Sequence, residues 1–298
     1  MTEKIITRRE FLKSSTLAAI AGALYLCSPI PLFPQPEKKT RVVLIRNKDV
    51  LDSLNRPRAE IVKQMLDEAV TALLNAENPV SAWKQLIKPT DVVGIKSNNW
   101  HYLPTPPELE AAIKRRVLDA GVSEKNIGIR DRGLLSDKVF LNATALINVR
   151  PIRTHYWSGV GSLLKNYIQF VGQPSSYHGD SCAELAAIWN LPLVKGKTRL
   201  NILVLLTPLF HGIGPHHFSP KYTWPYKGLL AGVDPVAVDS VGVRILLAKR
   251  REFFGEERPL NPPPKHIFLA DTRYRLGTAE PAKIELVKIG WQEDLLID

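Results

Sequence analysis

The stretch ALINVRPIRTHYWSGVGSLLKN, residues 145–166, decides how the rest of the chain is interpreted. It begins with an apolar run typical of a buried strand, which Arg150 and Arg153 interrupt as expected where a strand reaches the rim of a sheet. A loop follows that contains His155, a tyrosine, a tryptophan and glycines, and residues 163–166 predict the start of a helix. Because this loop gathers side chains able to do chemistry at the end of a buried strand, we expect the functional site here.

Strand and helix patterns alternate along the chain from residue 41. Short apolar runs predict buried strands, and an apolar stripe at helical spacing predicts a helix that covers a sheet. Thr105 and Glu108 have the spacing of a capping box, and Asp234 has the position of an N-cap. The alternation predicts an α/β fold with a mainly parallel sheet and helices on both faces. The predicted strands are residues 41–46, 91–96, 126–130, 145–149 and 200–206, and the predicted helices are residues 57–75, 105–120, 183–189 and 235–251.

Length, composition and charge bound the class of protein. The chain has 298 residues, of which 45% are hydrophobic, so it can bury a full core as one large domain or two small ones. Its formal net charge of +11 favours acidic ligands or an anionic surface. No block of basic residues and no basic stripe with interleaved aromatic residues is present, so we do not expect nucleic acid as a partner.

The chain has only two cysteines, Cys27 and Cys182. Cys27 lies in the apolar N-terminal segment, so the folded domain is expected to hold one thiol at most. This number excludes both a disulfide framework and an iron–sulfur cluster held by cysteines.

Residues 7–13, TRREFLK, precede an apolar run that ends near residue 27 and is followed by four prolines. This segment resembles a twin-arginine export signal. The resemblance implies export to the periplasm, the twin-arginine translocon as a partner, and loading of a cofactor or metal before export. The apolar run is shorter than the roughly 20 residues of a spanning helix, so we expect a soluble protein that meets the membrane only through its signal segment. Whether the signal is cleaved stays open.

The chain is therefore expected to have three parts. Residues 1–28 are the signal segment, residues 29–40 are a proline-rich linker, and residues 41–298 form a single α/β domain.

Polar residues follow the ends of several predicted strands. Lys96 and Asn98 follow one strand, Asp131 follows the next, and His155 follows the strand after that. Parallel strands bring their carboxyl ends to one edge of the sheet, so these side chains are expected around one pocket with Asp131 at its border. Lys96 ends a strand covered on both faces and needs a partner, either a carboxylate such as Asp131 or an anionic ligand.

Bland interpretations of the same residues stay open. His155 is equally explained by a hydrogen bond to a loop carbonyl, and Asn98 and Asp131 are also common turn residues. Lys165 and Asn166 lie in the first turn of the predicted helix, where free backbone N–H groups attract anions.

Three motifs in order resemble the domain of unknown function 362 family. They are residues 93–98 (VGIKSN), residues 153–166 with their histidine, glycine and LKN sequence, and residues 232–239 (GVDPVAVD). The family's biochemical role is not settled, so the resemblance implies positions rather than chemistry. The chain differs from the usual pattern at Ser97 and Arg153, and Thr207 stands where an aspartate often ends the strand, which weakens any metal site that the family implies.

Two further features were candidates for a site. The loop at residues 211–217 holds His211, His216 and His217, a set that can bind a divalent metal such as Zn²⁺. Asp239 lies one turn inside a mostly apolar helix and is expected to need a donor partner, for which a lysine or arginine of the site was the candidate.

Two functions from different classes follow. The first is an exported enzyme that acts on a small anionic or metal-associated ligand, with Lys96 and Lys165 stabilising charge and His155 as acid or base. Its ligand contacts would come from Asn98, Asp131, Asn166 and Asp239. The second is a non-catalytic factor that binds a cofactor or assists the maturation of an exported redox partner. No hydrolase, zinc-protease or nucleotide-binding motif is present, so the sequence leaves open whether the protein is an enzyme.

Overall fold

The structure is a computed structural model that describes residues 39–212 and 218–297. From Lys39 onward the chain forms one compact unit. The expected export signal, nearly all of the linker, and the metal-ligand candidates His216 and His217 lie outside the described residues.

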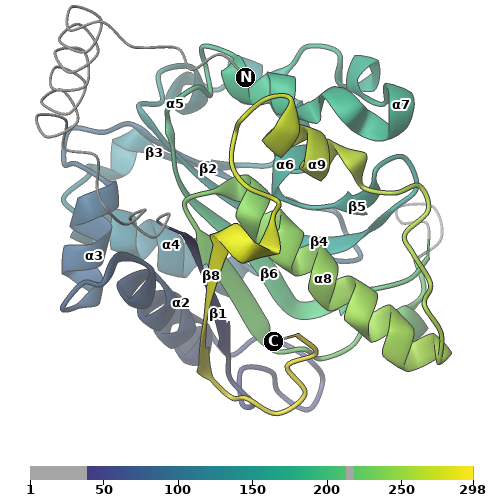
Figure 1. Ribbon diagram of the computed structural model, residues 1–298. Helices are drawn as coiled ribbons and strands as arrows, with labels where there is room; N and C mark the ends of the chain where they lie inside the picture. Colours follow the sequence, from purple (N-terminus) through teal and green to yellow (C-terminus); the bar gives the residue numbers. More distant parts are fainter. Residues whose placement is uncertain (1–38, 213–217, 298) are drawn as a thin grey trace, which may run out of the picture. The chain divides into compact units, whose positions relative to one another are not determined.

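The described residues form an eight-stranded sheet in the order β3-β2-β4-β6-β7-β1-β8, with β5 paired to β4 (Figure 1). The pairs β3–β2, β2–β4, β4–β6 and β1–β8 are parallel, which confirms the mainly parallel α/β prediction. The pairs of β7 with β1 and β6, and of β4 with β5, are antiparallel. The strands are β1 (Thr40–Arg46), β2 (Val93–Lys96), β3 (Ile127–Arg130), β4 (Ala145–His155), β5 (Gly159–Gly161), β6 (Thr198–Leu209), β7 (Gly228–Gly232) and β8 (Ile284–Gly290).

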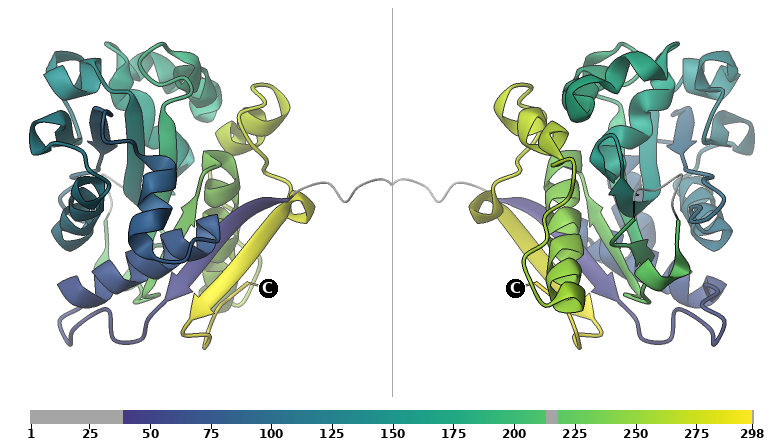
Figure 2. Two further views of the ribbon diagram at one scale, coloured as in Figure 1. Left: turned by 90° about the vertical axis from the view of Figure 1, so that its left-hand side faces the viewer. Right: turned by 90° about the vertical axis from the view of Figure 1, so that its right-hand side faces the viewer.

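Helices cover both faces of the sheet. Figure 2 shows α2 in front of one face and α8 in front of the other, with β1 and β8 side by side at one edge. The α-helices are α2 (Ala59–Leu74), α3 (Pro79–Leu86), α4 (Pro107–Asp119), α5 (Lys138–Leu141), α6 (Leu163–Asn166), α7 (Gly179–Cys182), α8 (Pro235–Phe254) and α9 (Lys265–Thr272). The 3₁₀ helices are η1 (Glu124–Asn126), η2 (Leu134–Ser136), η3 (Tyr167–Phe170), η4 (Pro174–Tyr177), η5 (Ala183–Asn190), η6 (Pro220–Tyr222) and η7 (Pro281–Lys283).

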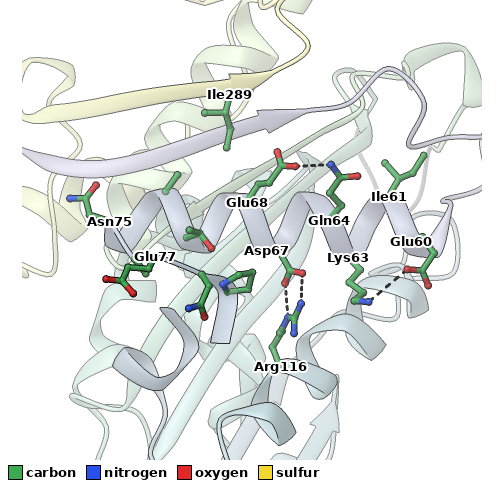
Figure 3. A pocket seen from close by; sticks show the side chains of 15 residues that line it. Glu60, Ile61, Lys63, Gln64, Asp67, Glu68, Asn75, Glu77, Arg116 and Ile289 are labelled. Carbon is green, nitrogen blue, oxygen red and sulfur yellow. Dashed lines mark hydrogen bonds and ion pairs between the residues drawn. The ribbon is translucent and has the colours of Figure 1, made fainter. Parts of the chain in front are cut away.

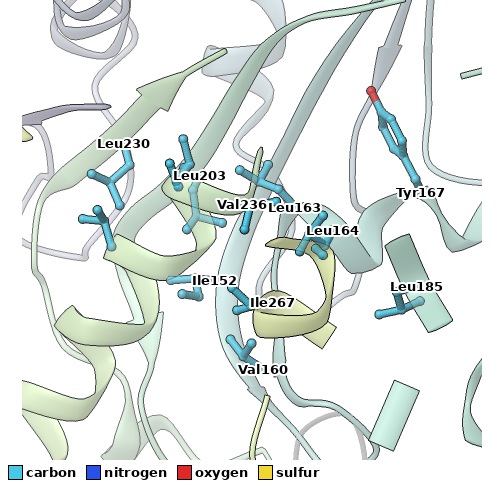
Figure 4. Close-up of a cluster of buried hydrophobic side chains, with 14 of the residues drawn as sticks. Ile152, Val160, Leu163, Leu164, Tyr167, Leu185, Leu203, Leu230, Val236 and Ile267 are labelled. Carbon is cyan, nitrogen blue, oxygen red and sulfur yellow. The ribbon is translucent and has the colours of Figure 1, made fainter. Parts of the chain in front are cut away.

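Side chains that alternate along the strands feed two hydrophobic cores. Ile147 and Val149 of β4 face the core under α2, α3 and α4, whereas Leu146 and Ile152 face the core under α6, α8 and α9. Figure 4 shows this second core, in which Leu163 and Leu164 of α6 lie between the sheet and α9. This packing fixes α6 against the end of β4.

Strand β4 is longer than the sequence predicted. It runs to His155 because β5 folds back onto it, pairing His155 with Gly159 and Arg153 with Gly161. Gly159 has φ +71°, and a Cβ there would lie 2.1 Å from the carbonyl oxygen of Pro262, so only glycine fits this turn. His155 is therefore the last residue of a strand and not a loop residue.

Two predictions about helix ends were tested in opposite directions. The side chain of Asp234 accepts hydrogen bonds from the N–H groups of Val236 and Ala237, which confirms it as the N-cap of α8. The predicted capping box at Thr105 is wrong, because α4 begins after Pro106 without a side-chain cap. Thr105 instead accepts a hydrogen bond from the N–H of Asn98 at 3.2 Å and closes the loop after β2.

The remaining differences are local. The predicted helix at residues 183–189 is the 3₁₀ helix η5, and the sequence did not predict α3, α9, β7 or β8. Within the described part of the chain, the helices are too short or too polar to cross a membrane.

Candidate functional site

A cavity of about 220 Å³ opens beyond the carboxyl ends of β2, β3 and β4. This is the edge of a parallel sheet at which ligands gather. Of the residues expected there, Asn98, Asp131, His155, Lys165 and Asn166 line the cavity, and Lys96 lies beneath it. The complete lining is Asn98, Trp100, Asp131, Arg132, Arg150, Arg153, His155, Trp157, Lys165, Asn166, Ile168, Gln169, Pro174 and His178.

Lys96 is fully buried and has carboxylate and amide partners. Its Nζ donates to Oδ1 of Asp131 at 2.9 Å, to Oδ1 of Asn166 at 3.2 Å and to the carbonyl oxygen of Ser97. Burial lowers the pKa of Lys96 to about 8, and the Asp131 charge opposes this effect. Burial also opposes ionisation of Asp131, but Lys96 outweighs it and the pKa of Asp131 is lowered. The two groups form an ion pair at the floor of the cavity.

Asn166 ties helix α6 to the sheet. Its Nδ2 donates to the carbonyl oxygen of Lys96 at 3.1 Å and to Oδ1 of Asn148 at 2.8 Å. Asn148 in turn donates to Oδ1 of Asn201 at 3.2 Å. The sequence analysis missed these two asparagines, although each is a polar residue within an apolar strand run, and such a residue needs a partner.

Asp239 is fully buried but does not have the lysine or arginine partner that we expected. It accepts hydrogen bonds from Oγ of Ser162 at 2.7 Å and from the N–H groups of Leu163 and Leu164, both at 2.9 Å. A carboxylate on α8 therefore holds the N-terminus of α6. Burial raises the pKa of Asp239 to about 6, and these three donors oppose the rise. Asp239 does not line the cavity, so its contribution is to position α6 and Lys165.

Two arginines of β4, Arg150 and Arg153, supply most of the positive charge of the cavity. Both are buried, at 3% and 6% exposure. Arg150 donates through Nη1 to the carbonyl oxygen of Ser162 at 3.2 Å, while its Nε has no hydrogen-bond partner among the described residues. Nε and Nη1 of Arg153 likewise have no partner there, and its guanidinium lies 4.2 Å from the ring centre of Trp100. Burial lowers the pKa of Arg150 to about 10.

Gly161 lies beside both guanidinium groups. A Cβ at this position would be 3.1 Å from Nη2 of Arg150, 3.2 Å from Nη1 of Arg153 and 3.5 Å from Cδ2 of His155. The absence of a side chain on β5 thus leaves room for the two arginines to point to one place.

We expect Gly161→Ala to disturb the site more than the fold. The added methyl group would make contacts tighter than most real Cβ contacts and push the guanidinium groups aside, so the affinity for an anionic ligand should fall severalfold while the unfolding temperature changes little. Calorimetric titration with sulfate and a thermal melt measure the two effects. A variant with full anion affinity would show that the arginines do not need this space.

His155 is 6% exposed and its hydrogen bonding defines its tautomer. Its Nδ1 accepts from the backbone N–H of Trp157 at 3.2 Å, so in the neutral ring Nε2 carries the proton. Burial, followed by the charges of Lys165 and Arg153, lowers the pKa of His155 far below its usual value. In this environment His155 is a neutral hydrogen-bond donor, which differs from the acid or base role that we considered from the sequence.

Lys165 is 5% exposed and its Nζ lies 3.4 Å from Sγ of Cys182. Burial lowers the pKa of Lys165; Cys182 opposes this effect, and Arg150 and Arg153 add to it. No carboxylate of the described residues lies within ion-pair distance of this lysine.

The largest groove lies elsewhere, along α2 (Figure 3). Its volume is about 920 Å³, but its charged groups pair with one another. Asp67 binds Arg116, and Lys63 contacts Glu60 at 3.7 Å, as Figure 3 shows. Because these groups already have partners, the groove offers a ligand little that water does not.

The metal-ligand candidate His211 lies next to an arginine. Its Nδ1 is 3.1 Å from Nη1 of Arg250. Burial and then the Arg250 charge lower the pKa of His211. Within residues 39–212 and 218–297, no three histidine, cysteine or acidic side chains are grouped as a metal ion requires.

Comparisons with known proteins place the chain in a family without defining its chemistry. The model of the family named Domain of unknown function (DUF362) matches residues 93–244, just over half of the chain. No curated protein and no solved structure matches. The matched region contains β2, β4, α6 and the first half of α8, and so every element that builds the cavity floor. The chain belongs to the DUF362 family.

Proposed function

We propose that the cavity at the end of β4 binds a small anion with more than one negative charge. The supporting observation is the set of buried guanidinium donors on Arg150 and Arg153 that have no partner among the described residues. A buried donor without a partner costs roughly 1–3 kcal/mol, and more when it is charged. An anion with several acceptor oxygens would remove this cost.

The balance of charge supports an anion with at least two charges. The charge of Lys96 is matched by Asp131 at 2.9 Å. The three cations Arg150, Arg153 and Lys165 then remain, with Asp239 as a further buried carboxylate near Arg150. The lining is therefore net positive.

The size and donor geometry narrow the ligand further. The volume of about 220 Å³ is below the roughly 300–1,000 Å³ of sites for drug-sized ligands, so the cavity suits a small molecule or the charged end of a larger one. Guanidinium groups match carboxylate and phosphate oxygens in pairs of parallel hydrogen bonds, and stacking on Trp100 holds the plane of Arg153. Nε2–H of His155 is a further donor. A divalent cation would meet the charges of the arginines, so the proposal does not include a metal at this cavity.

Anion binding is tested by thermal shifts and calorimetric titration with phosphate, sulfate and pyruvate. Each bound anion should raise the unfolding temperature of the wild type, because a ligand that binds only the folded state stabilises it. Arg153→Gln should weaken binding by roughly 10- to 150-fold, since a hydrogen bond to a charged group contributes about 1.5–3 kcal/mol. Arg251→Gln is the matched control, because Arg251 is exposed and pairs with Glu257. Equal affinity in wild type and Arg153→Gln would mean that anions bind elsewhere.

We also propose that the protein reaches the periplasm through the twin-arginine translocon, on the strength of the motif at residues 7–13. Changing Arg8 and Arg9 together to Lys should leave the precursor in the cytoplasm with its domain folded, because the folded domain does not depend on the signal. Cell fractionation with protease protection measures this outcome. Export of the double variant at the wild-type level would refute the routing.

A further inference from the structure

Lys165 differs from the other buried lysine of the site in its partners. Lys96 donates to a carboxylate, an amide oxygen and a carbonyl oxygen, so all three of its hydrogens are engaged. The recorded hydrogen-bond acceptor of Lys165 is Sγ of Cys182 at 3.4 Å, which is a weak acceptor. Lys165 lines the cavity and Lys96 does not. Of the two, Lys165 is the amine that a ligand can reach.

The surroundings of Lys165 favour the neutral amine. The side chain is buried, and Arg150, Arg153, His155 and His178 line the same cavity. Burial comes first among the causes that lower its pKa, and the arginines add to it. A lysine that is desolvated next to other cations is the usual form of an amine nucleophile in proteins, because the unprotonated nitrogen carries the reactive electron pair.

We propose that Lys165 forms a Schiff base with a short-chain 2-oxo acid, whose carboxylate is held by Arg150 and Arg153. This inference rests on the proposed anion site and names its ligand class. The cavity of about 220 Å³ contains both the guanidinium donors and the amine, so a carbonyl that Lys165 reaches lies close to the bound carboxylate in the ligand. A 2-oxo acid has the two groups on adjacent carbons.

The condensation balances without any further reagent. The Nζ electron pair of neutral Lys165 attacks the carbonyl carbon, and the C–N bond forms as the carbonyl π bond breaks. The oxygen takes one proton from the nitrogen and one from solvent and leaves as water. The product is a protonated imine that keeps one positive charge, which the ligand carboxylate offsets. Such an imine draws electrons from the neighbouring carbon and so activates it for further chemistry.

Cys182 is suited to orient the amine. It is fully buried, and burial raises the pKa of its thiol. A neutral thiol accepts a hydrogen bond from Nζ without fixing its charge, so the contact directs the nitrogen while leaving its electron pair available. Cys182 has φ +62° at the start of η5, directly after two other residues with positive φ, and this backbone brings its side chain under Lys165.

Reductive trapping tests the inference. The full folded protein is incubated with pyruvate and cyanoborohydride near neutral pH, and the modified residue is identified by intact-mass measurement and peptide mapping. We expect one reduced pyruvate adduct per chain, located on Lys165. Phosphate should slow its formation by occupying the same cavity. Exposed lysines should react far more slowly, because they stay protonated at this pH.

Two variants complete the test. Lys165→Arg keeps the positive charge but has no nucleophilic amine, so it should lose the adduct and keep the thermal shift with phosphate. Lys63→Arg, on the exposed face of α2, should trap pyruvate as the wild type does. An absence of any adduct on Lys165 in wild type that phosphate does stabilise would overturn the Schiff base and leave the anion site intact. An absence of stabilisation by phosphate and by pyruvate would overturn the anion site and this inference together. Phosphate protection is measured on the wild type alone, so the test does not depend on the folding of a variant.

Discussion

Asp239→Leu should destabilise the folded protein by about 3–5 kcal/mol, the size of loss seen when one partner of a buried charged network is removed. The change would leave three donors without their acceptor, namely Oγ of Ser162 and the N–H groups of Leu163 and Leu164. All three lie in the buried segment that begins α6, where water does not replace the lost bonds. Urea unfolding of the purified variant measures the free-energy difference.

Asp234→Ala is the matched comparison, because Asp234 is also an aspartate at the start of α8. It accepts from two N–H groups of the helix and from the N–H of Thr278 at 2.9 Å. Loss of a cap costs typically about 1 kcal/mol and up to about 2. We therefore expect Asp239→Leu to cost more than Asp234→Ala. Equal and small losses would mean that the start of α6 does not depend on Asp239.

Asp131→Leu should cost about 3 kcal/mol, because it leaves the charge of Lys96 buried without a carboxylate. The expected loss is at the lower end of the range for buried pairs, since the side chain of Asp131 keeps 14% of its exposure and Lys96 can lose its proton. The double variant Asp131→Leu with Lys96→Met should recover much of the loss, since it removes both charges. A double variant less stable than both single variants would show that the pair is not the source of the effect.

The same lysine gives the pH dependence a defined sign. The pKa of Lys96 is about 8 in the folded protein and 10.5 in the unfolded reference. Between these values the unfolded chain binds more protons, so the contribution of Lys96 to the unfolding free energy rises with pH across this window and is lost as pH falls through about 8. Lys96→Met should remove this part of the pH dependence in urea unfolding. An unchanged slope in the variant would assign it to another group.

The sequence was sufficient for the elements that set the site and insufficient for its charge. Local patterns predicted β2, β3 and α6, and the rule for the carboxyl ends of parallel strands then placed Lys96, Asp131 and Lys165 near one another. These predictions succeed because apolar periodicity is local and parallel strands share one edge.

Arg150 and Arg153 were taken only as the interruption that ends a strand. The structure continues β4 through both residues, because β5 returns from the other side of a glycine turn and pairs with them. That turn depends on contact between Gly159 and the loop around Pro262, about a hundred positions away. Such a contact leaves no periodic pattern in either segment. The partner of Asp239 was missed for the same reason, since it lies on α6 and not among the charged residues that the sequence suggested.

The most direct test of the anion site is a crystal structure of the protein grown or soaked with selenate, whose selenium gives an anomalous signal. The account predicts an anomalous peak inside the cavity, with selenate oxygens within hydrogen-bond distance of Nε and Nη1 of Arg153 and of Nε of Arg150, and with Nε2 of His155 facing the anion. Selenate bound only outside the cavity, with these guanidinium nitrogens turned to protein acceptors, would contradict it.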